Sequence, residues 1–232
     1  IASTLARIRC DAAPLGGQER LEAISTLVRP GHTPSCDWDK LSQHPRLRTK
    51  DLIAPNLMDF APAGRADAVE IDGMYASVLT LRDFGSVLED HYLASIIDLP
   101  MPLAVSVHIA PIVQSEAIAL VKRQIDWMDK EIIDEQTTAA KKGFSQSILT
   151  PEIRYAKEEA EELLDFLRNK NEHLFEYTGL IYTYADTVEA LERQVDQIVS
   201  IGQGNSLGIE PLYYRQRQAL NSVLPLGMNT YW

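Results

Sequence analysis

The sequence predicts an α+β protein in which strands and helices alternate and two long helices interrupt the alternation. Three observations support this prediction. Strict alternation of apolar residues marks a strand at 103–110, and apolar residues spaced three and four apart mark two helices between 115 and 169. Strand–helix patterns lie on both sides of these two helices. With 232 residues, 45% of them hydrophobic, the chain is long enough to bury a sizeable core.

The first part of the chain predicts an arm with one helix. That helix is indicated by apolar residues on one face: Leu21, Ile24 and Val28. Pro30-Gly31 ends it. We therefore expect residues 1–48 to be an N-terminal arm, the end of an upstream subdomain, and residues 49–232 to be the α+β domain. The start at Ile1, without a Met, is typical of an excised fragment.

A first β-α-β pattern follows. Met74–Arg82 is rich in strand formers, and Ser86-Val-Leu-Glu89 is a capping box that predicts the start of a helix. The strand at 103–110 comes next. Its alternate apolar residues are predicted to face the core: Leu103, Val105, Val107 and Ile109.

The two long helices predict an antiparallel hairpin near residues 114–170. The apolar seam of the first helix is Ile118, Val121, Ile125, Met128 and Ile132. That of the second is Ile153, Ala156, Ala160, Leu163 and Leu167. Thr150 and Pro151 form a start signal for the second helix, and 137–149 suits the hairpin tip. Such narrow seams are typical of helices that pack on each other.

A second β-α-β pattern closes the chain. It comprises a strand at Phe175–Tyr184, a helix capped by Asp186-Thr-Val-Glu189, and a strand at Leu207–Tyr213. The inner face of that helix is predicted to be Val188, Leu191, Val195 and Ile198. The order β-α-β, hairpin, β-α-β predicts a ferredoxin-like split βαβ sheet with an inserted helical hairpin.

Charge narrows the classes of partner. The net charge of −11 disfavours direct binding to nucleic acid or anionic lipid, because both need Lys and Arg. A basic protein partner is favoured instead. Tyrosines could form a stacking platform for single strands, but no Lys or Arg accompanies them at 175–185, so we favour packing. These tyrosines are Tyr177, Tyr182, Tyr184, Tyr213 and Tyr214. No apolar run is long enough to span a bilayer.

Residues that commonly perform chemistry are scattered. Cys10 and Cys36 lack CxxC spacing, so two free thiols are expected and not a metal site. Five histidines show no i, i+4 pair: His32, His44, His91, His108 and His173. Ser106 and His108 share a strand face without the orienting group and oxyanion hole of a catalytic triad. The carboxylates of the hairpin are expected on solvated outer faces.

No nucleotide-binding motor is visible in the sequence. A P-loop requires Gly-x-x-x-x-Gly-Lys-Ser/Thr, and no glycine here is followed by lysine. Gly202-Gln-Gly204 is interpreted as the end of a helix and a turn. We expect no catalysis and no cofactor in this chain.

Two strings nevertheless point to a family. Gln218–Gly227 resembles the Gln-x-x-Asn-Ser-x-Leu-Pro-Leu-Gly stretch that closes the N-terminal domain of conjugative type IV secretion ATPases. Arg48–Pro55 resembles the Lys-Asp-Leu-Ile-Ala-Pro signature that opens the same domain, mainly in Gram-positive-type members. The resemblance covers most of the chain, from about Gly17 to Gly227. In that family the motor begins after the Leu-Pro-Leu-Gly segment.

The resemblance implies an accessory domain that docks the motor to inner-membrane channel subunits and neighbouring protomers during DNA or protein transfer. It implies a cytoplasmic place, peripheral to the inner face of the membrane, and a homo-oligomer in the full-length protein. Candidates for contact with the motor domain are Arg215, Arg217, Gln218 and Asn221. Candidates for a partner-facing side of the hairpin are Asp126, Asp129, Glu158 and Glu162.

Two other classes stay open at this point. A ferredoxin-like sheet also suits a regulatory module that binds a small molecule, which would need a convergent polar pocket. A cytosolic enzyme of unassigned reaction is the third class. A thermal-shift screen with ATP, metabolites and metals separates them, because a docking domain is expected to respond to none.

Overall fold

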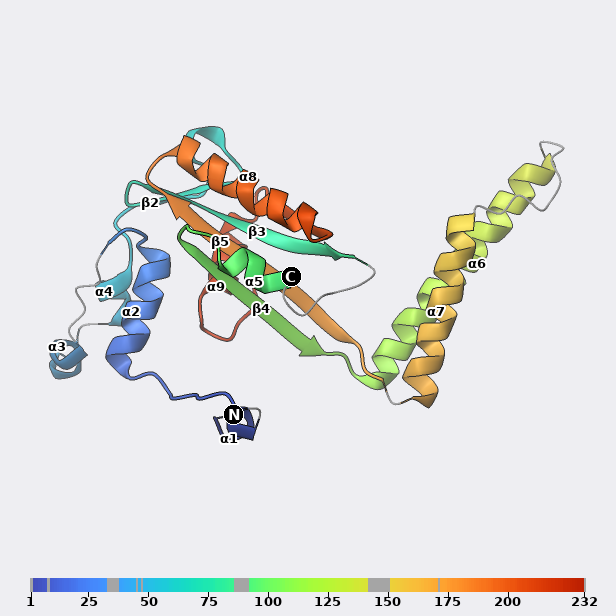
Figure 1. The fold of residues 1–232 in the computed structure, drawn as a ribbon, viewed down its shortest axis with the longest axis horizontal. Helices are drawn as coiled ribbons and strands as arrows, with labels where there is room; N and C mark the ends of the chain where they lie inside the picture. The colour runs from blue at the N-terminus through green and yellow to red at the C-terminus, as the bar shows by residue number, and fades with distance from the viewer. Residues whose placement is uncertain are drawn as a thin grey trace. The chain divides into compact units, whose positions relative to one another are not determined.

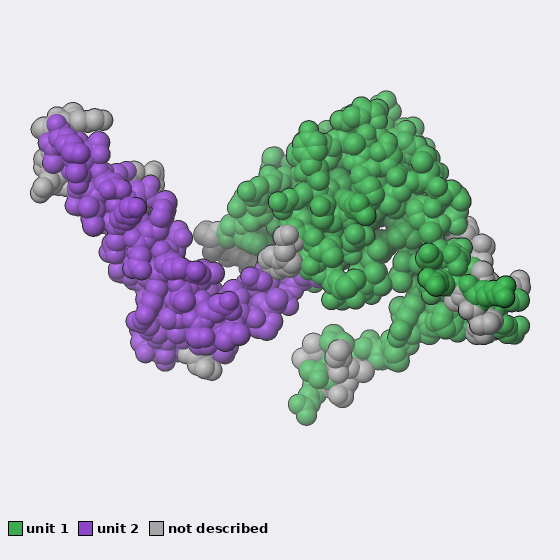
Figure 2. Space-filling model, turned by 180° about the vertical axis from the view of Figure 1, so that it is seen from behind, with its two compact units in different colours: residues 1–107, 178–232 green, residues 108–177 purple. Residues whose placement is uncertain are grey.

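The computed structural model describes residues 2–7, 9–32, 38–44, 46, 48–85, 92–141, 151–170 and 172–231. Two compact units make up the chain, coloured separately in Figure 2. One consists of residues 1–107 with 178–232, and the other of residues 108–177. Within the described residues, helices combine with a six-stranded sheet, so the predicted α+β class is confirmed.

The sheet is organised around a long central strand (Figure 1). Its strands are β1 (Met58–Asp59), β2 (Val69–Ile71), β3 (Met74–Phe84), β4 (Leu103–Pro111), β5 (Phe175–Ala185) and β6 (Leu207–Pro211). The order is β1-β2-β3-β5-β4, and β6 also pairs with β3. One edge of β3 pairs antiparallel with β5, while β2 and β6 share its other edge.

Helices cover both faces of the sheet. On one face, α8 (Val188–Gly204) packs on β3 and β6, and α5 (Tyr92–Ile97) packs on α8. On the other face, α9 (Gln216–Val223) packs on β3. Successive residues of β3 point to opposite faces, so Val78 joins the α9 core while Ser77 lies on the α8 side. The α9 core contains Val69, Ile71, Ala76, Val78, Leu180, Tyr182, Leu212, Ala219, Leu220 and Val223.

The N-terminal part holds α1 (Ala2–Arg7), α2 (Gly17–Val28), α3 (Trp38–Gln43), α4 (Thr49–Ile53) and the short 3₁₀ helix η1 (Pro62–Gly64). The helix predicted to end at Pro30-Gly31 is therefore confirmed as α2, with Leu21 buried. Leu27 of α2 packs on the α9 core, and its carbonyl accepts a hydrogen bond from the hydroxyl of Tyr182 at 3.0 Å. The boundary expected at residue 48 stays a prediction.

The second unit contains α6 (Gln114–Lys141) and α7 (Pro151–Asn169), which pack on each other. Their shared core is Ala117, Val121 and Leu167, surrounded by Ile112, Ile118, Ile125, Ala160, Leu163, Leu164 and Leu174. The predicted seams are confirmed except at Ala156, which is exposed. Pro151 is the first residue of α7, as predicted. The predicted tip beyond Lys141, together with Thr150, lies outside the described residues.

The facing predicted for β4 is wrong in its second half. Val107 and Ile109 are 39% and 62% exposed instead of buried. On the other side of the strand, Ala104 packs on the α9 core and the hydroxyl of Ser106 donates to the carbonyl of Ser222 at 3.3 Å. The cause is the place of β4 at the end of the strand order, where the covering on the Val107 side stops after the first residues.

Smaller details also differ from the prediction. The N-cap of α8 is Thr187 instead of Asp186, since the Thr187 hydroxyl accepts the amide hydrogen of Ala190 at 3.2 Å. Strand β6 ends at Pro211 instead of Tyr213. The capping box expected at 86–89 lies outside the described residues. The helix end expected at Gly202-Gln-Gly204 is confirmed, because α8 ends at Gly204.

Candidate functional site

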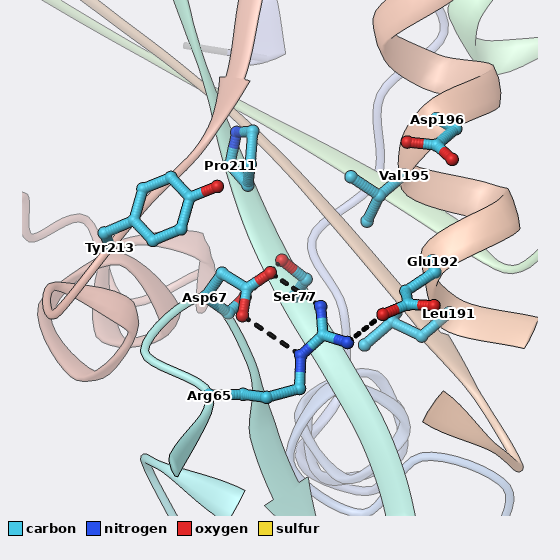
Figure 3. A pocket seen from close by; sticks show the side chains of 9 residues that line it. All are labelled: Arg65, Asp67, Ser77, Leu191, Glu192, Val195, Asp196, Pro211 and Tyr213. Carbon is cyan, nitrogen blue, oxygen red and sulfur yellow. Dashed lines mark hydrogen bonds and ion pairs between the residues drawn. The ribbon is translucent and has the colours of Figure 1, made fainter. Parts of the chain in front are cut away.

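A polar cavity of about 260 Å³ lies on the α8 side of the sheet (Figure 3). Three parts of the chain form its walls: the segment before β2, the end of β6 with the residues after it, and α8. Ser77 on β3 lies between them. The cavity is lined by Arg65, Asp67, Ser77, Leu191, Glu192, Val195, Asp196, Pro211 and Tyr213.

Arg65 bridges two carboxylates in this cavity, as the dashed lines in Figure 3 mark. Its Nη2 donates to Asp67 Oδ2 at 2.8 Å and its Nε to Asp67 Oδ1 at 3.2 Å, a two-point contact. Its Nη1 donates to Glu192 on α8. The hydrogen bonds that Arg65 donates to Asp67 and then to Glu192 raise the pKa of Arg65, and the bond from Arg65 lowers the pKa of Asp67.

The charge of the cavity wall is therefore negative. Asp67, Glu192 and Asp196 contribute three carboxylates, and Arg65 contributes one guanidinium that bonds to two of them. Ser77 is buried, and its hydroxyl donates to the carbonyl of Asp67 at 2.7 Å. The hydroxyl therefore serves a structural hydrogen bond and is not positioned as a nucleophile. The arrangement can accept hydrogen bonds or a cation, and its excess of carboxylates disfavours an anion.

The edge of β3 that faces away from β5 has a gap, which a side chain fills. Strand β2 pairs with β3 as far as Ala76, and β6 pairs from Leu79 onward. Between them, the amide of Val78 donates to Gln216 Oε1 at 2.8 Å, and Gln216 Nε2 donates to the carbonyl of Val78 at 3.0 Å. The carboxamide of Gln216, buried to 1% exposure, thus takes the place of a peptide group in the ladder.

Gln216 also fixes the start of α9. Its Nε2 donates to the carbonyl of Leu212 at 2.8 Å, which joins the end of β6 to the helix. Farther along α9, the hydroxyl of Ser222 donates to the carbonyl of Gln218 and accepts the amide hydrogen of Thr230 at 2.8 Å. The C-terminal string that carries the family resemblance is therefore a structural part of the α9 core.

The predicted contact residues at the C-terminus lie on the exposed side of that helix. Arg215, Arg217, Gln218 and Asn221 are all exposed. Arg215 is the N-cap residue of α9, and its guanidinium lies 6.0 Å from the centre of the Tyr231 ring. Arg217, Gln218 and Asn221 form a polar surface, while their neighbours Ala219, Leu220 and Val223 are buried.

The two residues that follow the other string bond to one aspartate, in the turn between β2 and β3. Lys50–Ile53 lies in α4, and Pro55 is followed by two amides, those of Asn56 and Leu57. Both amides donate to Asp72 Oδ1 at 2.8 Å. Asp72 stands in the Asp72-Gly73 turn between β2 and β3 and also pairs with Arg29 at the end of α2, at 3.3 Å.

Asp72 holds an unusual combination of burial and charge. Its side chain is only 6% exposed and its φ is 50°. Burial on its own would raise the pKa of the carboxyl, but hydrogen bonds from the amides of Leu57 and Asn56, aided by Arg29, bring that pKa below its ordinary value. The carboxylate therefore joins α2, the two residues after the first string and the β2–β3 turn.

The predicted hairpin residues do not form a shared site. Asp126, Glu158 and Glu162 are exposed. Asp129 is partly buried, and its Oδ1 accepts from Nζ of Lys157 at 2.6 Å, a pair that links α6 to α7 and raises the pKa of Lys157. Glu158 lies 4.0 Å from Nε of Arg154 on its own helix. The interpretation as solvated helix faces fits all but Asp129.

Residues that commonly catalyse or bind metals stay apart. Among the residues that the structure describes, no three His, Cys, Asp or Glu side chains gather in a way that could hold a metal ion. His173 contacts Gln114 at 3.1 Å, His32 contacts the carbonyl of Pro30, and Cys10 is exposed. Cys36 and His91 lie outside the described residues. Of the candidate tyrosines, Tyr182 is buried in the core, whereas Tyr213 and Tyr214 are exposed.

Sequence reasoning missed the residues that organise the cavity, the β2–β3 turn and the edge of β3. These residues are Arg65, Asp67, Asp72, Glu192 and Gln216. A usable signal existed for one of them, since Asp-Gly between short apolar runs indicates a two-residue hairpin turn. Arg65 and Glu192 meet only through the fold, 127 positions apart.

Comparison with known proteins adds no family. No protein-family model matches the chain, and no curated protein matches it. Within the described ranges, the longest helices are too polar to cross a lipid bilayer.

Proposed function

We propose that this chain is the accessory, N-terminal domain of a conjugative type IV secretion ATPase. Its role is to dock the motor to inner-membrane channel subunits and neighbouring protomers during transfer of DNA or protein. The chain itself performs no catalysis in this proposal, and the parent enzyme hydrolyses ATP with a motor that follows in sequence. The proposed place is cytoplasmic, at the inner face of the membrane.

The observation that carries the proposal is the place of the two family-like strings in the fold: Ala219, Leu220 and Val223 of the second string are buried in the α9 core, and the first string leads into the two amides that bond to Asp72. The residues after Pro55 bond to Asp72 in the β2–β3 turn, and α9 seals the β3 edge through Gln216. Strings whose residues build the fold point to a domain type and not to a reaction. The exposed polar side of α9, with Arg217, Gln218 and Asn221, is then the surface offered to the motor.

The arrangement of the sheet gives further support. We propose that β3, β4, β5 and β6 form the ferredoxin-like part of the fold. The order β6-β3-β5-β4, with α5 between β3 and β4 and α8 between β5 and β6, suits a split βαβ unit. The helical hairpin enters between β4 and β5 and has its own core, as expected for an insertion in the family's α/β domain.

Two measurements test this function. The coding sequence that follows residue 232 is expected to contain a P-loop, and a reading frame without one overturns the proposal. In the full-length ATPase, Arg217→Glu and Asn221→Ala are expected to lower transfer frequency at least about tenfold while protein abundance is unchanged. The matched control is Arg193→Glu, an exposed arginine on α8, on the other side of the sheet. Equal loss in the control argues against the docking surface.

The cavity beside Arg65 favours one alternative function, a regulatory module that binds a small molecule. Its carboxylates and the Tyr213 ring suit a cationic or hydrogen-bond-donating ligand. A thermal-shift screen of amines, amino acids and nucleotides separates the two functions. A ligand whose effect disappears in Glu192→Gln supports the regulatory module, and no response supports the docking domain.

A further inference from the structure

One outer side of α6 carries a stripe that its pairing with α7 leaves exposed. Leu120, Arg123, Trp127 and Lys130 follow each other at intervals of three, four and three residues, which places them on one side of the helix. Leu120 is 46% exposed and Trp127 is 56% exposed, while the seam to α7 uses other residues. We call these four residues the basic stripe.

The outer side of α7 carries a stripe with the same intervals. Tyr155, Glu158, Glu162 and Asp165 are exposed and again three, four and three residues apart. Tyr155 is 56% exposed. We call these four residues the acidic stripe. Each stripe spans ten residue steps, about 15 Å of helix.

The two stripes have the same length and spacing, and they carry opposite charges. Two cations alternate with two apolar side chains on α6, and three carboxylates accompany one aromatic ring on α7. Large exposed apolar residues such as Trp127 are the kind that supplies binding energy at an interface, and flanking charges select the partner. In the described part of the chain neither Arg123 nor Lys130 forms an ion pair.

We propose that the basic stripe of one copy of this chain docks onto the acidic stripe of a second copy. Both stripes face away from the α6–α7 seam, so one contact leaves the second copy's basic stripe free for a third. Such a contact is heterologous and therefore builds a ring or a chain of protomers instead of a closed dimer. The partner is the chain itself because the complementary charge, at the matching spacing, lies on its own next helix.

This inference rests on the proposed function, because it names the surface of the proposed contact with neighbouring protomers. Its own evidence is the exposed faces of the two hairpin helices. Its test needs no channel subunit, motor or nucleotide. A chain that self-associates without docking to a secretion channel, or the reverse, therefore distinguishes failure of one proposal from failure of the other.

The first experiment is sedimentation equilibrium of the whole chain at about 50 mM and about 500 mM salt, which changes screening of exposed charges. At low salt the average mass is expected to rise with concentration above the 26.0 kDa of one chain, and to fall back at high salt. Trp127→Ala and the pair Arg123→Glu with Lys130→Glu are each expected to weaken association about tenfold or more. Lys122→Glu, an exposed lysine of α6 outside the stripe, is the matched control and leaves association within about twofold.

A charge exchange gives the sharper test. A chain with Arg123→Glu and Lys130→Glu has two acidic stripes, and a chain with Glu158→Lys and Glu162→Lys has two basic stripes. Each is expected to stay monomeric alone, and an equal mixture is expected to associate, because every contact then joins opposite charges. Circular dichroism of each variant verifies that the helices are retained.

Three outcomes overturn the proposal. The first is a chain that stays at 26.0 kDa up to millimolar concentration at low salt. The second is association that the stripe variants weaken no more than Lys122→Glu does. The third is a mixture of the two charge-exchanged chains that behaves as the sum of two monomers.

Discussion

Asp72→Ala is expected to lower the free energy of unfolding of the sheet unit by about 4 kcal/mol. The carboxylate accepts the amides of Asn56 and Leu57, both at 2.8 Å, and a charged acceptor makes each bond worth at least about 1.5 kcal/mol. Alanine at the φ of 50° adds about 1 kcal/mol of backbone strain. Arg29, 25% exposed, loses its partner but stays partly hydrated, so its share is small.

Two further variants separate these contributions. Asp72→Asn keeps the φ and an oxygen for the two amides but loses the charge, so a loss of about 1–2 kcal/mol is expected. Asp72→Gly keeps the φ and loses every side-chain bond, so it falls between the asparagine and alanine variants. Urea denaturation followed by circular dichroism gives the stabilities, and amide hydrogen exchange at Asn56 and Leu57 reports the local effect. An alanine variant within about 0.5 kcal/mol of the parent would refute the role assigned to Asp72.

The same carboxylate predicts a pH dependence. Its pKa in the folded chain lies below the ordinary value, so the folded state holds the proton more weakly than the unfolded state. Its stabilisation is therefore fully present above the unfolded pKa of about 3.9 and is lost as the pH falls through the folded pKa. The stability gap between the parent and Asp72→Asn should be constant from about pH 5 to 7 and shrink below about pH 4. A gap that widens in acid contradicts the sign.

Three further predictions concern other substitutions. Gln216→Leu leaves the buried amide of Val78 unpaired, while the Val78 carbonyl still accepts from the amide of Leu212 at 3.2 Å, so the substitution should cost about 2–4 kcal/mol by urea denaturation. A loss below about 1 kcal/mol would show that water fills the gap. Val78→Asp should prevent folding, while Val107→Asp should stay within about 1 kcal/mol of the parent, and the opposite ranking would contradict the exposure of β4. Gly202→Val places a methine carbon 2.6 Å from Ile209 and should cost about 1–3 kcal/mol, with partial recovery in combination with Ile209→Val.

Much of the fold could be predicted from periodicity. Helices α6, α7 and α8 have long apolar seams, and β3 and β5 are eleven-residue runs of strand formers. Long elements repeat their pattern several times, so a single irregular residue does not hide it. The order of these elements along the chain followed from the same patterns.

Short elements and polar cores could not be predicted in this way. Strand β2 has three residues, too few to show alternation. Helix α9 has eight residues and buries Gln216 and Ser222, so its inner face is partly polar and its apolar pattern is broken. The error on β4 has a different cause: alternation shows that a strand has two faces, but only the neighbours decide which face is covered.

The cavity was also beyond prediction. Its charges come from the segment before β2 and from α8, and nothing local in either segment marks them as partners. The predicted hairpin carboxylates, by contrast, were placed on the correct helices, since helical faces follow from residue spacing alone.

The side chain that completes the β3 ladder makes the sheet depend on residues that come late in the sequence. Strands β2, β3, β5 and β6 all precede residue 216, so the sheet can assemble while the amide of Val78 still lacks its acceptor. Strands β2 and β6 occupy the edge of β3 on either side of that amide, so no further strand can reach it. Synthesis of α9 supplies the Gln216 carboxamide, which pairs with the amide. Helix α9 therefore completes the sheet as its last step, and fragments that stop before it are expected to be less stable by the cost of a buried, unpaired amide.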